Sequence, residues 1–257
     1  MKSSRLASLL TLSGIALILA SVLVFLYLKS VGDQSTTYTQ SRDLISQIKQ
    51  LNSQWDVEVL KARIALTHNY DPLVAPFKEM SALWAMLESR EAQHRHTNLA
   101  DWQAAQDAYR QSFQEKARLV EQFKSHHAVL RNSLAFLPTA EDDIQAHFLQ
   151  LDDADKLQQQ NIATDTYDLL LSALEFAQVT SDDKAADILV GLNKLAINKQ
   201  SLPAEFQVPV EILSNHITLI LREQPLVNDL LDRIAAIPLS DQLDAMTTQL
   251  NHDQSAP

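Results

Sequence analysis

Apolar residues recur three and four positions apart over most of this chain, and this spacing decides its class of fold. The stripe in the first long segment consists of Leu44, Ile48, Leu51, Trp55, Val59, Ala62 and Leu66. Side chains so spaced lie on one face of an α-helix, whereas a half-buried strand alternates apolar and polar residues. Because no convincing run of strand type is present, the sequence predicts an all-α fold.

The same spacing marks the later helices, and prolines suggest where some of them end. After the first helix we expect helices at about residues 72–91, 98–137, 141–160, 162–179, 183–198, 209–222, 225–236 and 240–250. Pro138 should end one helix, and Pro203 and Pro209 should bracket a loop, because proline cannot continue a helix. Long amphipathic helices joined by short loops pack as antiparallel neighbours. We therefore predict two tandem antiparallel helical bundles, residues 33–138 and 139–250, and a disordered tail at 251–257.

The composition excludes several classes of function. With only three glycines, the chain cannot build the closely spaced glycines of a phosphate-binding loop. It has no cysteine, which excludes disulfides, thiolate metal sites and a cysteine nucleophile. A net charge of −11 argues against nucleic acid as a partner. Ser133 and Ser172 have no recognisable base partner, and the "HRH" at residues 94–96 lacks a third metal ligand nearby in sequence. We predict no catalytic residues, no metal and no cofactor, so the chain is not expected to be an enzyme.

Residues 6–28, "LASLLTLSGIALILASVLVFLYL", carry no charge and predict a transmembrane helix. At about 1.5 Å per residue they span about 34 Å, enough to cross a hydrocarbon core of about 30 Å. A cleaved secretory signal is the alternative, although its apolar region is usually shorter. Lys2 and Arg5 precede the run and favour a cytoplasmic N-terminus at residues 1–5. We expect a single-pass protein of the bacterial inner membrane, with the bulk of the chain in the periplasm.

The stretch "RIALTHNYDPLVAPF", residues 63–77, predicts a helix corner. Pro72 suits the first position of a helix, Asp71 suits the N-cap before it, and Asn69 tolerates the left-handed conformation that often ends a helix. Capping explains these three residues, but it explains Arg63 and Tyr70 less well. Arg63 borders the apolar stripe, where a guanidinium needs an acceptor. That acceptor is either Asp71 or an anionic or carbonyl-bearing ligand.

A second polar break interrupts a seven-residue apolar repeat. His127 occupies one position of the series 120, 123, 127, 130, 134 and 137, and Arg131 and Asn132 follow it closely. One interpretation is a hydrogen-bonded core histidine that specifies packing register. The other is a polar patch that faces Arg63 and Tyr70 across the bundle. We therefore single out seven tentative ligand-binding residues: Arg63, Asn69, Tyr70, Asp71, His127, Arg131 and Asn132.

Two of these stretches carry a family resemblance. "WDVEVLKARIALTHNYDPLV" (55–74) and "LVEQFKSHHAVLRNSLAFLP" (119–138) resemble the double all-helical ligand-binding (DAHL) sensor family, and "LSNHITLILREQPLVNDLLDRI" (213–234) fits its last part. The resemblance covers roughly residues 35–250. It implies two helical bundles in tandem, in the extracytoplasmic sensor region of a membrane-bound bacterial histidine kinase or diguanylate cyclase. Family members normally continue into a second membrane helix and an output module. Neither precedes Pro257, so we expect a truncated sensor product or a protein that acts through a partner.

Two functions remain open at this point. The first is a membrane-anchored periplasmic sensor region of a two-component or cyclic-di-GMP signalling system, lacking its own output domain. A small molecule or periplasmic protein would bind it and favour one of two helix arrangements. The second is a helical adaptor or structural protein that acts by protein–protein contact without a small ligand. We prefer the sensor, and we expect a homodimer.

Overall fold

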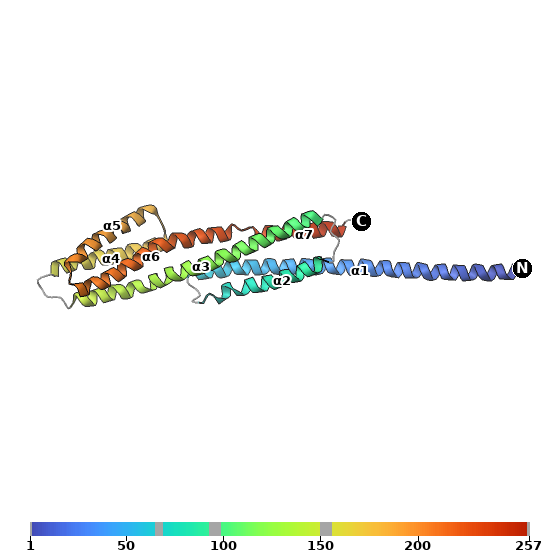
Figure 1. Cartoon of the computed structure of the whole chain (residues 1–257), viewed down its shortest axis with the longest axis horizontal. Coiled ribbons are helices and arrows are strands. Elements are labelled where there is room, and N and C mark those ends of the chain that lie inside the picture. The colour runs from blue at the N-terminus through green and yellow to red at the C-terminus, as the bar shows by residue number, and fades with distance from the viewer. Residues whose placement is uncertain (1, 65–68, 93–98, 150–155, 256–257) are drawn as a thin grey trace. The chain divides into compact units, whose positions relative to one another are not determined.

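The computed structural model describes residues 2–64, 69–92, 99–149 and 156–255, with side chains described at 17–24, 38–64, 69–92, 99–149, 160–204 and 207–253. Within these residues it contains seven α-helices and no strand, which confirms the predicted all-α class (Figure 1). The helices are α1 (Lys2–Arg63), α2 (Ala75–Glu91), α3 (Leu99–Phe148), α4 (Lys156–Gln178), α5 (Asp182–Asn198), α6 (Ala204–Ala235) and α7 (Leu239–Ser255). Two short 3₁₀ turns, Asp71–Leu73 and Lys199–Ser201, lie between them.

Three prolines lie inside helices, so the predicted helix end at Pro138 and the predicted helix starts at Pro209 and Pro225 are wrong. The helix α3 continues through Pro138 to Phe148, and α6 contains both Pro209 and Pro225. A proline in a helix removes one backbone hydrogen bond at a local cost. Burial of the apolar stripe on either side outweighs this cost in α3, where Leu137 and Ile144 are almost inaccessible to solvent.

The corner after α1 differs from the prediction in its first turn. Asp71 does not cap a helix that starts at Pro72. Residues Asp71–Leu73 form a 3₁₀ turn, closed by a bond of 2.9 Å from the Val74 amide to the Asp71 carbonyl oxygen. The helix α2 begins at Ala75. At the other end of the chain, α7 runs to Ser255, through most of the segment expected to be a disordered tail.

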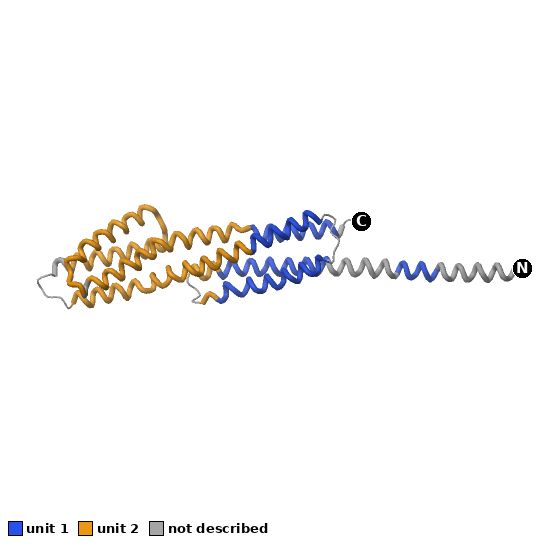
Figure 2. The backbone as a smooth tube through the Cα atoms, in the orientation of Figure 1, with its two compact units in different colours: residues 1–58, 71–113, 238–257 blue, residues 59–70, 114–237 orange. Residues whose placement is uncertain are grey.

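The chain forms two compact units that are interleaved in sequence (Figure 2). Unit 1 comprises residues 1–58, 71–113 and 238–257, and unit 2 comprises residues 59–70 and 114–237. The helices α1 and α3 therefore contribute residues to both units. The boundary expected between residues 138 and 139 lies instead within α3 and within unit 2.

Aromatic side chains hold the core of unit 1 together. Trp55 of α1 lies with its ring centroid 6.1 Å from that of Phe113 on α3, and Phe113 stacks at 5.1 Å on Phe77 of α2. Trp84 of α2 stacks at 4.1 Å on Tyr109 of α3. Such ring pairs add to the free energy gained by burying apolar area. The helix α7 completes this unit, with buried side chains at Leu239, Leu243, Met246 and Leu250.

In unit 2, the helix α4 packs against α5 and α6, which lie beside it in Figure 1. Gly191 of α5 faces Leu169 of α4 so closely that a Cβ at position 191 would lie 2.7 Å from Leu169 Cδ2. A larger residue would force these helices apart or move the leucine. Close packing here therefore depends on a glycine inside a helix, where glycine is otherwise unfavourable.

The transmembrane prediction falls largely on residues whose side chains lie outside the description. Only residues 17–24 of the run 6–28 have described side chains. Among the described residues, no helix is sufficiently long and apolar to span a bilayer. The membrane span therefore stays a prediction from the sequence.

Replacing Pro138 by alanine tests how this proline affects α3. Pro138 is exposed inside the helix, so Pro138→Ala restores a backbone amide donor without removing a core contact. We expect the free energy of unfolding to rise by about 1 kcal/mol, less than the full helix-interior cost of proline because alanine also adds entropy to the unfolded chain. Urea unfolding measures the change.

The neighbouring exposed Thr139 provides the control. Thr139→Ala changes a side chain on the same turn without adding a backbone donor, so it should change stability by only a few tenths of a kcal/mol. A lower stability for Pro138→Ala than for the parent protein would show that the local geometry set by the proline is required.

Candidate functional site

Four of the predicted binding residues meet in unit 2, and we call them the corner cluster: Arg63, Tyr70, His127 and Arg131. The Tyr70 hydroxyl lies 2.9 Å from His127 Nδ1, and the two rings meet edge to face with centroids 6.0 Å apart. The Arg131 guanidinium carbon lies 5.4 Å from the centre of the Tyr70 ring, within the range of a cation–π contact. The polar positions of α3 therefore reach the residues that follow α1.

The helical repeat of α3 explains how His127 and Arg131 reach this place. Phe123, His127 and Arg131 are four residues apart and so share one face of the helix. Phe123 is fully buried, and its ring stacks on that of His127 at 5.1 Å. His127 itself is only 4% exposed. A polar side chain thus occupies a core position of the stripe, and Tyr70 provides its hydrogen-bond partner.

Arg63, the last residue of α1, finds its acceptors on α6. Its Nη2 donates to Asn228 Oδ1 at 3.3 Å. With its amide oxygen turned toward Arg63, the buried Gln224 accepts a second bond from Nη2 at 3.0 Å, and its nitrogen donates to the Ala177 carbonyl. Both acceptors are neutral. Within the described part of the chain, Arg63 has no carboxylate partner.

The charge of the corner cluster is positive at neutral pH. Burial, followed by the charges of Arg131 and Arg63, lowers the pKa of His127 to about 4, so its imidazole is neutral. Burial raises the pKa of Tyr70, and the opposing influence of Arg131 is smaller, so the phenol keeps its proton. The cluster therefore presents two guanidinium charges and two neutral hydrogen-bonding groups, an arrangement suited to an anionic or carbonyl-bearing group.

The sequence analysis missed the contribution of α6 to this region. Gln224 and Asn228 are four residues apart, so they lie on the same face of α6. Both amides can therefore accept hydrogen bonds from Arg63. Beside them, the carboxylate of Glu223 is nearly inaccessible and accepts bonds from His126 Nδ1 at 2.6 Å and Arg222 Nε at 2.7 Å. Burial acts to raise the pKa of Glu223, but these two hydrogen bonds outweigh it and lower the pKa. The sequence signal for this contribution is the polar run "REQ" at residues 222–224, which interrupts an apolar helical pattern. Because Pro225 follows it directly, the run resembles a helix end.

The other predicted residues lie nearer the surface. Asn69, Asp71 and Asn132 all have exposed side chains. The "HRH" at residues 94–96 lies outside the described residues. No group of three or more His, Asp or Glu side chains is placed to hold a metal ion in the described ranges. Whether any of the seven residues binds a ligand stays a prediction.

The lowered pKa of His127 predicts a loss of stability in mild acid. The unfolded histidine, with a pKa of about 6.5, takes up its proton before the folded one. The stabilising contribution of neutral His127 is therefore complete above about pH 6.5 and is lost as the pH falls to about 4. We expect a loss of about 2 kcal/mol, allowing for partial solvent screening.

Urea unfolding between pH 7 and pH 4, compared with His127→Gln, isolates this contribution. Glutamine can bond to Tyr70 but does not titrate, so the variant should lose less stability over the same range. Equal losses in the two proteins would contradict the buried neutral histidine.

A double-mutant cycle measures the bond between Tyr70 and His127 directly. Tyr70→Phe and His127→Leu each remove one partner, and the double variant removes both. We expect a favourable coupling of about 1 kcal/mol in urea unfolding, the usual net value of a hydrogen bond. Additive effects of the two substitutions would show that the pair contributes no specific interaction.

Comparisons with known proteins agree with the helical architecture. The fold is similar to the crystal structure of the sensor domain of the V. parahaemolyticus histidine kinase sensor TorS, with a TM-score of 0.65, covering 85% of this chain and 97% of that chain. The two sequences are 10% identical, so this likeness establishes the fold alone. A search of curated proteins found no match. The DAHL domain model matches residues 33–256, and the chain therefore belongs to the DAHL domain family.

Proposed function

We propose that the chain is the ligand-binding sensor region of a bacterial signalling protein, with the corner cluster as its binding site. Membership of the DAHL family and a fold shared with a histidine kinase sensor domain support the sensor role. The observation that carries the choice of site is the environment of Arg63. Its guanidinium lies partly buried at the end of α1, and the acceptors that it bonds are the neutral amides of Asn228 and Gln224.

The chemistry of the cluster indicates the class of ligand. A partly buried charge is stable when an opposite charge or several strong dipoles compensate for its lost hydration. Amide oxygens compensate for Arg63 only in part, and Arg131 adds a second positive charge nearby. An incoming carboxylate or phosphate would complete the compensation, and Tyr70 and His127 would add hydrogen bonds. We therefore infer a small anionic ligand for this site.

A ligand in the corner cluster would contact three helices of unit 2. Arg63 ends α1, His127 and Arg131 lie on α3, and Asn228 lies on α6. A ligand changes the equilibrium between two helix arrangements only if it binds them with different affinity. Because the side chains come from different helices, small relative movements of these helices would change the fit. We propose that this difference in affinity shifts the equilibrium between the two helix arrangements, and that the shift is the signal.

The cellular setting is part of the same proposal. The uncharged run 6–28 and the basic residues before it support an inner-membrane anchor with the remaining chain in the periplasm. The output would be phosphorylation by a histidine kinase or synthesis of cyclic-di-GMP, delivered by an attached or partner module. A homodimer would place two such regions side by side across one membrane.

Arg63→Ala tests the proposed site. The full chain in detergent is first screened against small carboxylates and phosphates by thermal unfolding. A ligand that saturates the site should raise the midpoint by about 5 °C. We expect Arg63→Ala to abolish this rise while its circular dichroism spectrum stays helical, because the alanine cannot pair with the anion.

The control removes an equivalent charge elsewhere. Arg118 is exposed and pairs with Glu115 one turn away at 2.5 Å, so Arg118→Ala should leave the ligand-induced rise unchanged. A stabilising ligand whose effect survives Arg63→Ala would exclude Arg63 from the site.

Exposed apolar side chains on α5 favour a second candidate, a helical adaptor that acts by protein–protein contact. Leu189, Val190 and Ile197 are 52%, 68% and 69% exposed. Apolar residues of this size outside a core can mark a protein interface. If the adaptor role is correct, serine at these three positions should abolish signalling in cells while Arg63→Ala has no effect. The sensor role predicts that Arg63→Ala abolishes the response.

A further inference from the structure

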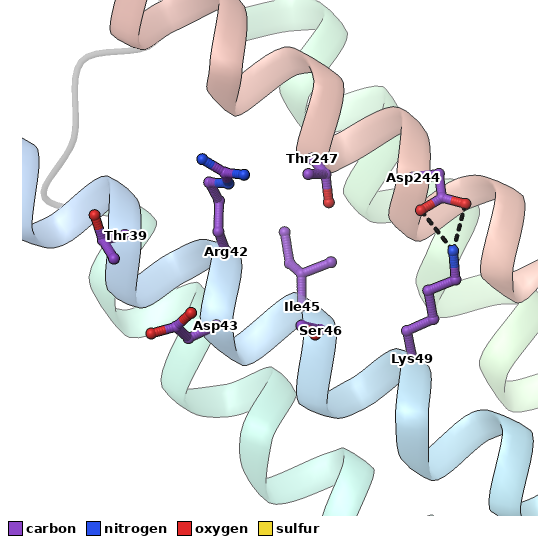
Figure 3. A pocket seen from close by; sticks show the side chains of 8 residues that line it. All are labelled: Thr39, Arg42, Asp43, Ile45, Ser46, Lys49, Asp244 and Thr247. Carbon is purple, nitrogen blue, oxygen red and sulfur yellow. Dashed lines mark hydrogen bonds and ion pairs between the residues drawn. The ribbon is translucent and has the colours of Figure 1, made fainter.

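A polar cavity opens between α1 and α7 within unit 1, apart from the residues of the corner cluster (Figure 3). Its volume is about 540 Å³, which is in the range of small-molecule sites. Its wall comes from two helices: α1 contributes Thr39, Arg42, Asp43, Ile45, Ser46 and Lys49, and α7 contributes Asp244 and Thr247. Two helices that are distant in sequence thus share one cavity.

Four charged side chains of the described residues line the cavity, those of Arg42, Asp43, Lys49 and Asp244. Lys49 Nζ is engaged by both carboxylate oxygens of Asp244, at 2.6 and 2.8 Å. Arg42 has no hydrogen-bond or ion-pair partner in the part of the chain that the structure describes. Figure 3 shows its guanidinium extending into the space between the helices, while the neighbouring Asp43 points away from it. Among the described residues that line the cavity, Arg42 is therefore the cation left to pair with a ligand.

The remaining groups define what the rest of a ligand should carry. Ile45 is only 2% exposed and supplies apolar surface to the wall. Ser46 and Thr247 supply hydroxyl groups from the two helices. The Thr247 hydroxyl donates to the Leu243 carbonyl at 2.9 Å, so its oxygen remains an acceptor for a donor on the ligand.

We propose that this cavity is a second binding site, for a small hydroxylated organic monoanion. Its carboxylate would pair with Arg42, because the planar guanidinium can donate two parallel hydrogen bonds to a carboxylate. Its apolar part would contact Ile45, and its hydroxyl group would bond to Ser46 or Thr247. A monoanion fits better than a dianion, since Lys49 is already neutralised by Asp244.

Binding at this site would tie α1 to α7. These helices are already joined by the Lys49–Asp244 pair and by a bond of 3.3 Å from Asn52 to Ser240. A ligand held by Arg42 on one helix and by Thr247 on the other would strengthen the same contact. The site is independent of the proposed sensing at the corner cluster, and it stands if that proposal fails.

Calorimetric titration of the full chain in detergent with 3-hydroxybutyrate tests the proposal. This probe carries one carboxylate, one hydroxyl and an apolar carbon chain, and its neutral amide, 3-hydroxybutyramide, differs only in charge. At low ionic strength, where exposed charges are least screened, we expect millimolar binding of the acid and no measurable binding of the amide. Equal binding of acid and amide, or no binding of the acid at 20 mM, would overturn the proposal.

Two substitutions should change the affinity in opposite directions. Arg42→Gln should weaken binding by about tenfold or more, as expected for loss of a charge-assisted bond. Asp244→Asn should strengthen binding severalfold, because it frees Lys49 and removes a negative charge from the wall. Damage to the fold would weaken binding in both variants, so only the opposite responses support the site.

Two further variants locate the probe. Arg118→Gln, which removes an exposed arginine that does not line this cavity, should leave the affinity unchanged. Arg63→Gln distinguishes the two candidate sites. Loss of binding in Arg63→Gln with full binding in Arg42→Gln would assign the probe to the corner cluster and overturn the proposal for the cavity.

Discussion

A single apolar stripe along α3 supplies buried side chains to both compact units. Trp102, Tyr109 and Phe113 pack in unit 1, and Phe123, Leu130 and Leu137 pack in unit 2. Burying such a stripe is the main favourable contribution to folding of an amphipathic helix. It also sets the direction of every other side chain on the helix. The position of His127 in unit 2 follows from this register.

The corner cluster places a polar group, His127, at a position of the α3 stripe that would otherwise be apolar. His127 is held neutral by burial and by two nearby guanidinium groups, and Tyr70 supplies its hydrogen bond. Arg63 is bonded to amides rather than to a carboxylate. Positive charge therefore collects in one place on a chain whose net charge is −11. This imbalance is the physical basis for assigning an anionic ligand to the site.

The spacing of apolar residues predicted the fold class, since a repeat of three and four positions suits only helices. The seven-residue repeat also placed His127 on a buried face, because that inference needs only the geometry of one helix. Helix boundaries were less predictable. The local cost of Pro138, Pro209 and Pro225 is visible in the sequence, but the burial that outweighs it depends on tertiary packing. Gln224 and Asn228, like the cavity beside Arg42, depend on which helices lie together, and no single-helix pattern reveals this.

The central claim is that a ligand pairs with Arg63 in the corner cluster. Nitrogen NMR of the arginine side chains tests it most directly, with assignments from Arg63→Lys and Arg131→Lys. On titration with a stabilising anion, the Nε signals of Arg63 and Arg131 should shift together and saturate with the same midpoint as the thermal stabilisation. Full stabilisation of the protein with both signals unmoved would contradict the claim.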